Sequence, residues 1–226
     1  MPILAIETST LVSSVAIATP DALLAELTLK VRKTHSERLM PHIESLLQMA
    51  ELEAKNLRAV AVSMGPGSFT GLRIGISTAK ALAYALKIPL IGVPTLKALA
   101  YALPAPNIYL SPMLDAQKGN VYQAVFEWAD GCLTEIIAPR AIAFTEAQEE
   151  LLRLEKPHLI LGEAVEMYWE KIISPAPGHL AMPRAGSAAV LAQNMLAAGE
   201  YGDAFSLEPF YIRRSEAEVL WERRQG

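Results

Sequence analysis

Apolar and polar residues alternate most clearly in the segment from Leu23 to Val31. Its odd-numbered positions are all apolar and the residues between them are mostly polar, a pattern typical of a half-exposed strand. Two shorter apolar segments precede it, at 3–7 and 13–18, and the polar turn Thr8-Ser9-Thr10 joins them. We therefore expect three strands before the first helix.

Helical spacing begins after these strands. Leu39, Ile43 and Leu46 repeat at intervals of three and four residues, which predicts a helix over 36–50 if Pro41 lies in its first turn. The rest of the first half is predicted to contain strands at 59–63 and 90–93 and helices at 72–86 and 95–103. The predicted order is βββαβαβα.

A proline-rich stretch, Leu103-Pro104-Ala105-Pro106, interrupts the pattern and predicts a boundary between residues 1–103 and 104–226. After it, strands are expected at 107–113, 121–128, 133–138 and 158–161, and helices at 145–154, 164–172 and 187–198. From Glu208 on, the chain is expected to be extended and then partly helical. The second half thus repeats the order βββαβα. This duplication resembles the actin-like (ASKHA) architecture, an α/β fold with two subdomains.

A glycine-rich loop with the sequence SMGPGSFTGLRIG joins the fourth strand to the following helix over residues 63–75. Thr70 is the expected N-cap, and the amides at that helix start could hold an anion. The loop lacks the Gly-Lys-Ser/Thr end of a Walker motif and the third glycine of a dinucleotide fingerprint. A tight turn that lets the helix pack closely is therefore favoured over nucleotide binding.

Small residues recur every fourth position on that helix and predict close packing against another helix, inside or outside the chain. They are Gly71, Gly75, Ala79 and Ala83.

Composition limits the possible classes of protein. The chain has 226 residues, 52% of them hydrophobic, but charged residues interrupt every apolar run before membrane-spanning length. The start reads as a strand rather than a signal peptide, so a cytoplasmic location is expected. The single cysteine, Cys132, excludes an internal disulfide. A net charge of −4 argues against nucleic-acid binding by this chain alone, although Arg213, Arg214, Arg223 and Arg224 form a basic cluster near the end.

Several stretches together are similar to one family. They are IETST at 6–10, HSERLMPHIESLL at 35–47, GPGSFTGLRIG at 65–75, LDAQKGNVYQAVF at 114–126, and PFYIRR near the end. They resemble the TsaB family, also called YeaZ, the bacterial non-catalytic paralogues of the threonylcarbamoyl transferase TsaD.

The resemblance implies a scaffold role in forming N6-threonylcarbamoyladenosine at position 37 of tRNA. It implies pairing with TsaD through a helical interface in the first subdomain, joined by the ATPase TsaE. It further implies a homodimer when the chain is alone, and contact with tRNA only through the complex. The residues expected at the partner interface are Leu39, Ile43, Leu46, Gly71, Gly75, Ala79 and Ala83.

The residues favour a non-catalytic chain without a resident cofactor. TsaD-like relatives hold a metal with an H-x-x-x-H pair, and the matching segment here, Pro94 to Leu99, has no histidine. His35 and His42 would stand about 10 Å apart on one helix, too far for one ion. Asp115 and Lys118 occupy the first turn of the second repeat, where a phosphate loop could form, but a turn-stabilising aspartate is favoured.

Two alternative functions stay open. One is an ATP-dependent phosphotransferase of the sugar-kinase type, which the architecture permits. The other is a metallopeptidase, which the lack of an HExxH motif weighs against.

Overall fold

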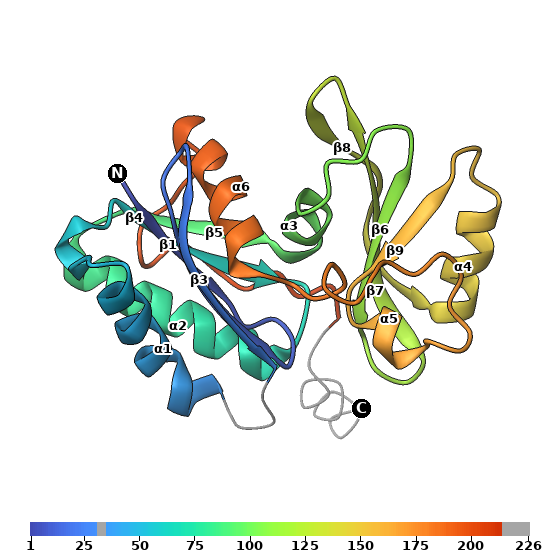
Figure 1. The fold of residues 1–226 in the computed structure, drawn as a ribbon. Coiled ribbons are helices and arrows are strands. Elements are labelled where there is room, and N and C mark those ends of the chain that lie inside the picture. Colours follow the sequence, from blue (N-terminus) through green and yellow to red (C-terminus); the bar gives the residue numbers. More distant parts are fainter. Residues whose placement is uncertain (31–34, 214–226) are drawn as a thin grey trace.

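The computed structural model describes residues 1–30 and 35–213, which form two lobes, each built around one β-sheet (Figure 1). The first lobe contains β1 (Ile3–Glu7), β2 (Val12–Ala18), β3 (Leu23–Lys30), α1 (His35–Met49), the 3-10 turn η1 (Ala54–Asn56), β4 (Ala59–Gly65), α2 (Phe69–Leu86) and β5 (Leu90–Pro94). Helix α3 (Thr95–Tyr101) leads to the second lobe, which contains β6 (Tyr109–Asp115), β7 (Asn120–Ala129), β8 (Cys132–Ala143), α4 (Phe144–Leu152), β9 (His158–Leu161) and α5 (Ala164–Met167). Helix α6 (Ala185–Ala197) ends the regular structure.

The two sheets share one topology. In the first, with the order β3-β2-β1-β4-β5, β1 is antiparallel to β2 and parallel to β4. In the second, with the order β8-β7-β6-β9, β6 is antiparallel to β7 and parallel to β9. The predicted duplication of three antiparallel strands, a helix and a parallel strand is therefore confirmed, and the fold is actin-like.

Strand β1 is buried on both faces because helices cover both sides of the first sheet. Leu4 and Ile6 face a core that includes residues of α1 and α2, whereas Ile3 and Ala5 face a core that includes residues of α6. This explains why every residue of β1 is buried and why the strand lacks the alternation seen in β3, which lies at the sheet edge.

Helix α6 returns to the first lobe, although the expected boundary placed it with residues 104–226. Its alanines pack against small residues of β1, β2 and β4, including Ala5, Ala16 and Ala61. Small side chains on both surfaces allow the helix to lie close to the sheet. The second lobe is therefore formed by residues from β6 to α5, and the described segment after α6 also follows the first lobe, pairing Gly202 with Leu90.

Helix α3 lies between the lobes. Its Leu96 and Leu99 pack with Leu110 and Phe126 of the second sheet, and α3 also contacts α6. The lobes are thus joined through apolar packing around α3.

Some predicted boundaries were wrong. Pro41 is the seventh residue of α1 rather than part of its first turn. Proline has no N–H to donate to the carbonyl of Glu37, four residues earlier. The site is exposed, so water can hydrate that carbonyl and the proline is tolerated. Helix α5 ends at Met167 instead of reaching residue 172. The chain turns there because Ile172 and Ile173 pack into the second core, where the Gln148 side chain accepts the amide of Ile173 at 2.8 Å.

Strand β8 is longer than predicted, extending to Ala143. The residues from Glu208 to Arg213 show no helix, and the rest of the predicted C-terminal helix lies outside the described residues. No helix in the described ranges has the length and apolar character needed to cross a membrane.

Candidate functional site

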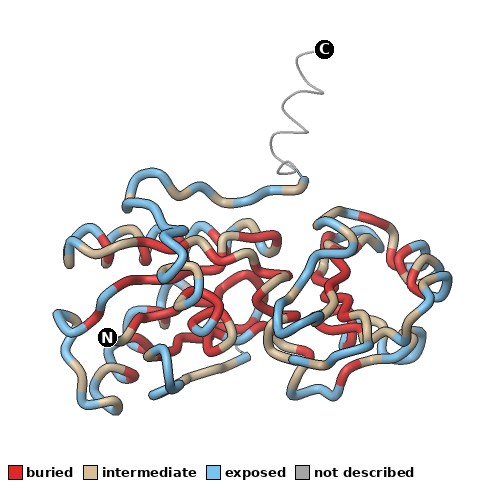
Figure 2. The backbone as a smooth tube through the Cα atoms, turned by 90° about the horizontal axis from the view of Figure 1, so that it is seen from above, coloured by how far each residue is buried: buried red, intermediate tan, exposed pale blue. Residues whose placement is uncertain are grey.

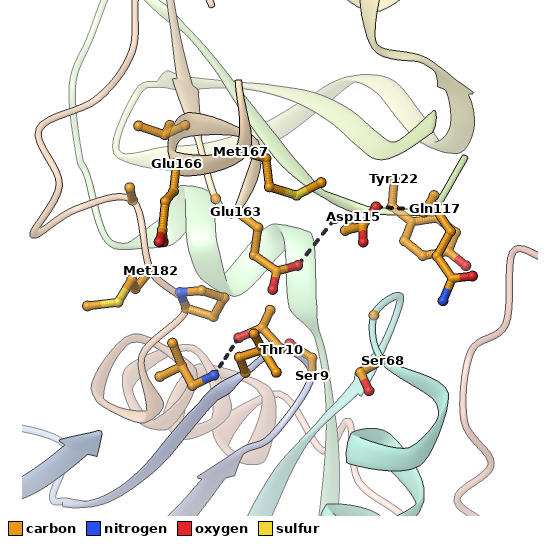
Figure 3. A pocket seen from close by; sticks show the side chains of 18 of the residues that line it. Ser9, Thr10, Ser68, Asp115, Gln117, Tyr122, Glu163, Glu166, Met167 and Met182 are labelled. Atoms are coloured by element: carbon orange, nitrogen blue, oxygen red, sulfur yellow. Dashed lines mark hydrogen bonds between the residues drawn. The ribbon is translucent and has the colours of Figure 1, made fainter. Parts of the chain in front are cut away.

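A cleft of about 1890 Å³ separates the lobes, and loops from both sheets meet there (Figure 3). It is lined by the β1–β2 turn, the glycine-rich loop before α2, the β6–β7 turn and the start of α5. Ligands of α/β proteins commonly bind where such loops converge. The cleft is therefore the first place to look for chemistry.

The β1–β2 turn forms one wall, and its carboxylate is used to hold the turn together. Glu7 is buried; it accepts the amide of Ser9 at 2.6 Å and the hydroxyl of Ser63 on β4. Thr10 accepts the amide of Val12 at 3.1 Å. The functional group of Glu7 is thus directed into the protein, where it ties β1 to β4.

The glycine-rich loop packs against this turn, in agreement with the tight-turn interpretation. The amide of Ser68 donates to the carbonyl of Ser9 at 2.6 Å, and a Cβ on Gly67 would lie 2.4 Å from that carbonyl oxygen. The N-cap of α2 is Ser68, whose hydroxyl accepts the amide of Gly71 at 3.3 Å, so the prediction of Thr70 was wrong. The helix therefore begins at Phe69, directly after its N-cap.

The opposite wall carries two carboxylates that also stabilise turns. Asp115 accepts the amide of Gln117 at 2.7 Å, as expected for a turn-stabilising aspartate. Glu163, at the start of α5, accepts the amide of Asp115 at 3.2 Å. Burial raises the pKa of Glu163, and the charges of Asp115 and Glu7 raise it further, while hydrogen bonding from the amides of Asp115 and Leu11 opposes the shift. Glu163 therefore holds the β6–β7 turn, and it lies close enough to the β1–β2 turn for Leu11 and Glu7 to affect its pKa.

Sequence reasoning did not identify Glu163, and the only available signal was its position directly after a predicted strand of the second repeat. Arg213 was noted only as part of the basic cluster. It reaches the cleft, where its guanidinium donates to the carbonyl of Ala116 at 2.6 Å. The other arginines of that cluster lie outside the described residues.

The residues expected at a partner interface form part of the protein's own core. Each of them is buried: Leu39, Ile43, Leu46, Gly71, Gly75, Ala79 and Ala83. On α1 they face the sheet, and on α2 the glycines contact Thr8 of the β1–β2 turn. The structure therefore contradicts their assignment to a docking surface. A partner of these helices would meet their outward residues instead.

The described histidines are separate from one another. His42 lies in the core, 3.5 Å from the hydroxyl of Ser13, while His158 opens β9 and His179 is exposed. Within residues 1–30 and 35–213, no group of three or more His, Cys, Asp and Glu side chains is placed to hold a metal ion. At the start of α3, where TsaD-like relatives were expected to carry metal ligands, Thr95 accepts the amide of Gly65 at 3.2 Å.

Comparisons with known proteins point to one family. The family model described as TsaD, tRNA N6-adenosine threonylcarbamoyltransferase, matches residues 28–221. The tRNA threonylcarbamoyladenosine biosynthesis protein TsaB of Bacillus subtilis is 33% identical over 234 residues, covering 100% of both chains. The protein of the same name from Escherichia coli is 29% identical over 233 residues, covering 100% of this chain and 99% of its own.

Solved structures agree. The structure described as YeaZ from Pseudomonas aeruginosa is 25% identical and aligns with a TM-score of 0.77, covering 93% of this chain and 99% of its own. A second structure, described as an uncharacterized protein with similarity to peptidase YEAZ from Pseudomonas aeruginosa, aligns with a TM-score of 0.78 at 25% identity, covering 94% and 99%. The similarity extends over both lobes.

Proposed function

The chain belongs to the TsaB family, and from this premise we propose that it is a non-catalytic subunit in tRNA threonylcarbamoyladenosine biosynthesis. In this role it binds and supports a TsaD-type transferase in the cytoplasm. The main support for this proposal is the end-to-end match to the Bacillus subtilis TsaB protein, with 100% of both chains covered. A match of this extent includes both lobes and the cleft between them.

The polar side chains of the turns that form the cleft walls support a structural role. Glu7, Thr10 and Asp115 each accept a backbone amide of their own turn. Side chains engaged in this way hold the two lobes in shape. They are not poised as general acids, bases or nucleophiles, which need an accessible reacting atom.

The outward surface of α1 and α2 is the proposed contact with the TsaD-type partner. Met40 and Met49 of α1 are exposed, and so are the small residues Ser77, Ala81 and Ala85 of α2. Exposed methionines adapt to a partner's shape, and small residues allow a partner helix to approach closely. When the chain is alone, the same surface would pair two copies. The ATPase TsaE and the tRNA substrate would join through the complex.

An omission assay tests the proposed function. Purified TsaD-type transferase, TsaE and the adenylate-forming enzyme are incubated with unmodified tRNA, with and without this chain, and threonylcarbamoyladenosine is measured by mass spectrometry. The expected result is product only when the chain is present and none from the chain alone. Equal product without the chain would refute a supporting role.

The phosphotransferase alternative is tested on the isolated chain by titrating ATP with Mg²⁺ in a calorimeter. We expect no saturable heat, since we propose that the protein holds no resident cofactor. Saturable binding would favour the phosphotransferase and would justify a substrate screen.

A further inference from the structure

Two cations lie on one side of α2, and a third follows at its end. Arg73 and Lys80 are seven residues apart, so they lie on the same side of the helix about 10.5 Å apart along its axis. Lys87 is the C-cap residue directly after the helix, in the left-handed conformation. This side faces the C-terminal segment 200–213, because Arg73 and Lys80 both donate hydrogen bonds to that segment. Figure 2 shows the segment as a mostly exposed stretch along the first lobe.

An aromatic group accompanies the first cation. The guanidinium of Arg73 lies 3.9 Å from the ring centroid of Phe69, which stacks on Tyr211 with centroids 5.0 Å apart. Arg73 also donates to the Tyr211 hydroxyl at 3.3 Å. The first position of the row is thus a cation combined with two stacked rings.

Aromatic residues also lie near the other two cations. Lys80 donates to the carbonyl of Phe205 at 3.4 Å, and the Phe205 ring meets Tyr84 edge-on with centroids 5.6 Å apart. Lys87 and Tyr201 line a groove of about 740 Å³ beside this pair. We call the cations Arg73, Lys80 and Lys87, together with Phe69, Tyr84, Tyr201, Phe205 and Tyr211, the cation–aromatic row.

Four of the five aromatic side chains of the row are exposed, and Phe69 is half-buried. Phe205 is 75% exposed and Tyr84 65% exposed. Of the exposed aromatic side chains in the described part of the chain, all except Trp169 belong to α2 or to the segment 200–213. Such a concentration of exposed rings is unusual, because large apolar side chains gain free energy by burial.

The turn that presents Phe205 is held by hydrogen bonds. Asp203 accepts the amides of Phe205 and Ser206 at 2.7 and 2.8 Å, and Gly202 pairs with Leu90 of β5. An exposed ring on a structured turn loses little further conformational entropy on binding. The surface is therefore pre-organised for a ligand with flat apolar faces.

The cations of the row are available to an anion. None of the three forms an ion pair with another described residue. The nearby carboxylate of Asp203 accepts the amides of its own turn, and its charge also interacts with Lys80. Glu200 lies at the start of the segment, and Glu208 lies within it, between Phe205 and Tyr211. Exposed aromatic rings combined with nearby cations are the features that bind the bases and phosphates of a single-stranded nucleic acid.

We propose that the cation–aromatic row binds an unpaired segment of RNA, with bases on the exposed rings and phosphates on Arg73, Lys80 and Lys87. The inference rests on the proposed function for its choice of RNA, and it assigns this chain a direct contact with the tRNA substrate. Because the whole chain has a net charge of −4, this contact adds to binding by the assembled complex rather than giving high affinity alone.

The experiment measures fluorescence anisotropy of labelled, unmodified tRNA with the complex of this chain and its TsaD-type partner. Two row variants are compared with wild type: Phe205→Ala, and the double variant Lys80→Ala/Lys87→Ala. Two matched controls remove the same kinds of group elsewhere: Trp169→Ala, an exposed ring in the cleft, and Arg153→Ala, an exposed cation on the second lobe.

Phe205→Ala is expected to weaken binding about tenfold through lost stacking. The double lysine variant is expected to weaken it by a similar factor and to lower the slope of log affinity against log salt by about 2. Both controls should bind as wild type does. Unchanged affinity in the two row variants would overturn the proposal.

A second readout separates RNA from a protein partner. The same variants are passed over a gel-filtration column with the TsaD-type partner. Normal co-elution is expected, and loss of the complex would mean that the row is a protein surface, which overturns the proposal. The omission assay gives an independent result. If product forms equally without the chain but the row variants weaken RNA binding, only the supporting role is refuted. If product requires the chain but the row variants bind RNA as wild type does, only the proposal for the row is refuted.

Discussion

Gly75 of α2 lies so close to Thr8 of the β1–β2 turn that a Cβ atom on Gly75 would stand 2.2 Å from the Thr8 hydroxyl oxygen. One helical turn earlier, a Cβ on Gly71 would stand 2.0 Å from the Thr8 carbonyl oxygen, and the Thr8 hydroxyl donates to the Gly71 carbonyl at 2.8 Å. The glycines thus allow α2 to lie directly on the first turn, which fixes one wall of the cleft.

The first prediction concerns this contact. Gly75→Ala should lower the free energy of unfolding by about 1–3 kcal/mol, because the added methyl group cannot fit beside Thr8 without displacement. In the double variant Gly75→Ala/Thr8→Ala the loss should be smaller than the sum of the two single losses, since the second change removes the clashing oxygen. Urea unfolding followed by circular dichroism measures all three.

Ser77→Ala is the matched control, as Ser77 is exposed on the same helix and should change stability by less than about 0.5 kcal/mol. Additive losses in the double variant would show that Gly75 and Thr8 are not coupled.

The second prediction concerns the return of α6 to the first lobe. A fragment of residues 1–103 should not fold, because it leaves the face formed by Ile3, Ala5 and Ala61 without the helix that covers it. A chain ending at residue 213 keeps α6 and should fold. Amide-proton dispersion in NMR spectra distinguishes the two, and a folded 1–103 fragment would contradict the division of the lobes described here.

The third prediction locates the partner surface. Ala81→Arg should abolish co-elution with the TsaD-type partner while leaving the melting temperature within a few degrees, because Ala81 is exposed on the outward side of α2. A bulky side chain there keeps a partner helix at a distance. The control is Glu149→Arg, because Glu149 is exposed on α4 of the second lobe. Ala147 of the same helix is buried and would not serve. Unchanged pairing by Ala81→Arg would exclude this face.

The fourth prediction concerns pH. Burial lowers the pKa of His42, and the charge of Arg38 lowers it further. The unfolded chain therefore binds a proton at a higher pH than the folded chain does, so stability is complete above the unfolded pKa of about 6.5 and is lost as pH falls below it. His158 has a pKa lowered by burial and acts in the same direction.

Unfolding by urea at pH 7.5 and pH 5.5 measures this effect. His42→Gln should reduce the loss of stability between these pH values. An identical pH dependence in His42→Gln and wild type would show that His42 does not contribute.

The order of strands and helices could be predicted from the sequence because it depends on local periodicity. Alternation in β3 and the spacing of Leu39, Ile43 and Leu46 in α1 each require only neighbouring residues. The predicted length of helix α5 was too great because its end depends on a distant contact, the hydrogen bond that the Ile173 amide donates to the Gln148 side chain. The motif stretches identified the family for a related reason: they are continuous segments of the chain.

What the sequence determined by itself is which residues share a face, as with the small residues of α2 and the apolar residues of α1. Only the tertiary structure decided what covers each face. It placed Thr8 against Gly71 and Gly75, returned α6 to the alanines of the first sheet, and brought Glu163 to the first turn of the other lobe. Periodicity is a property of one element, whereas the partner of a buried face is chosen by packing between segments far apart in the chain.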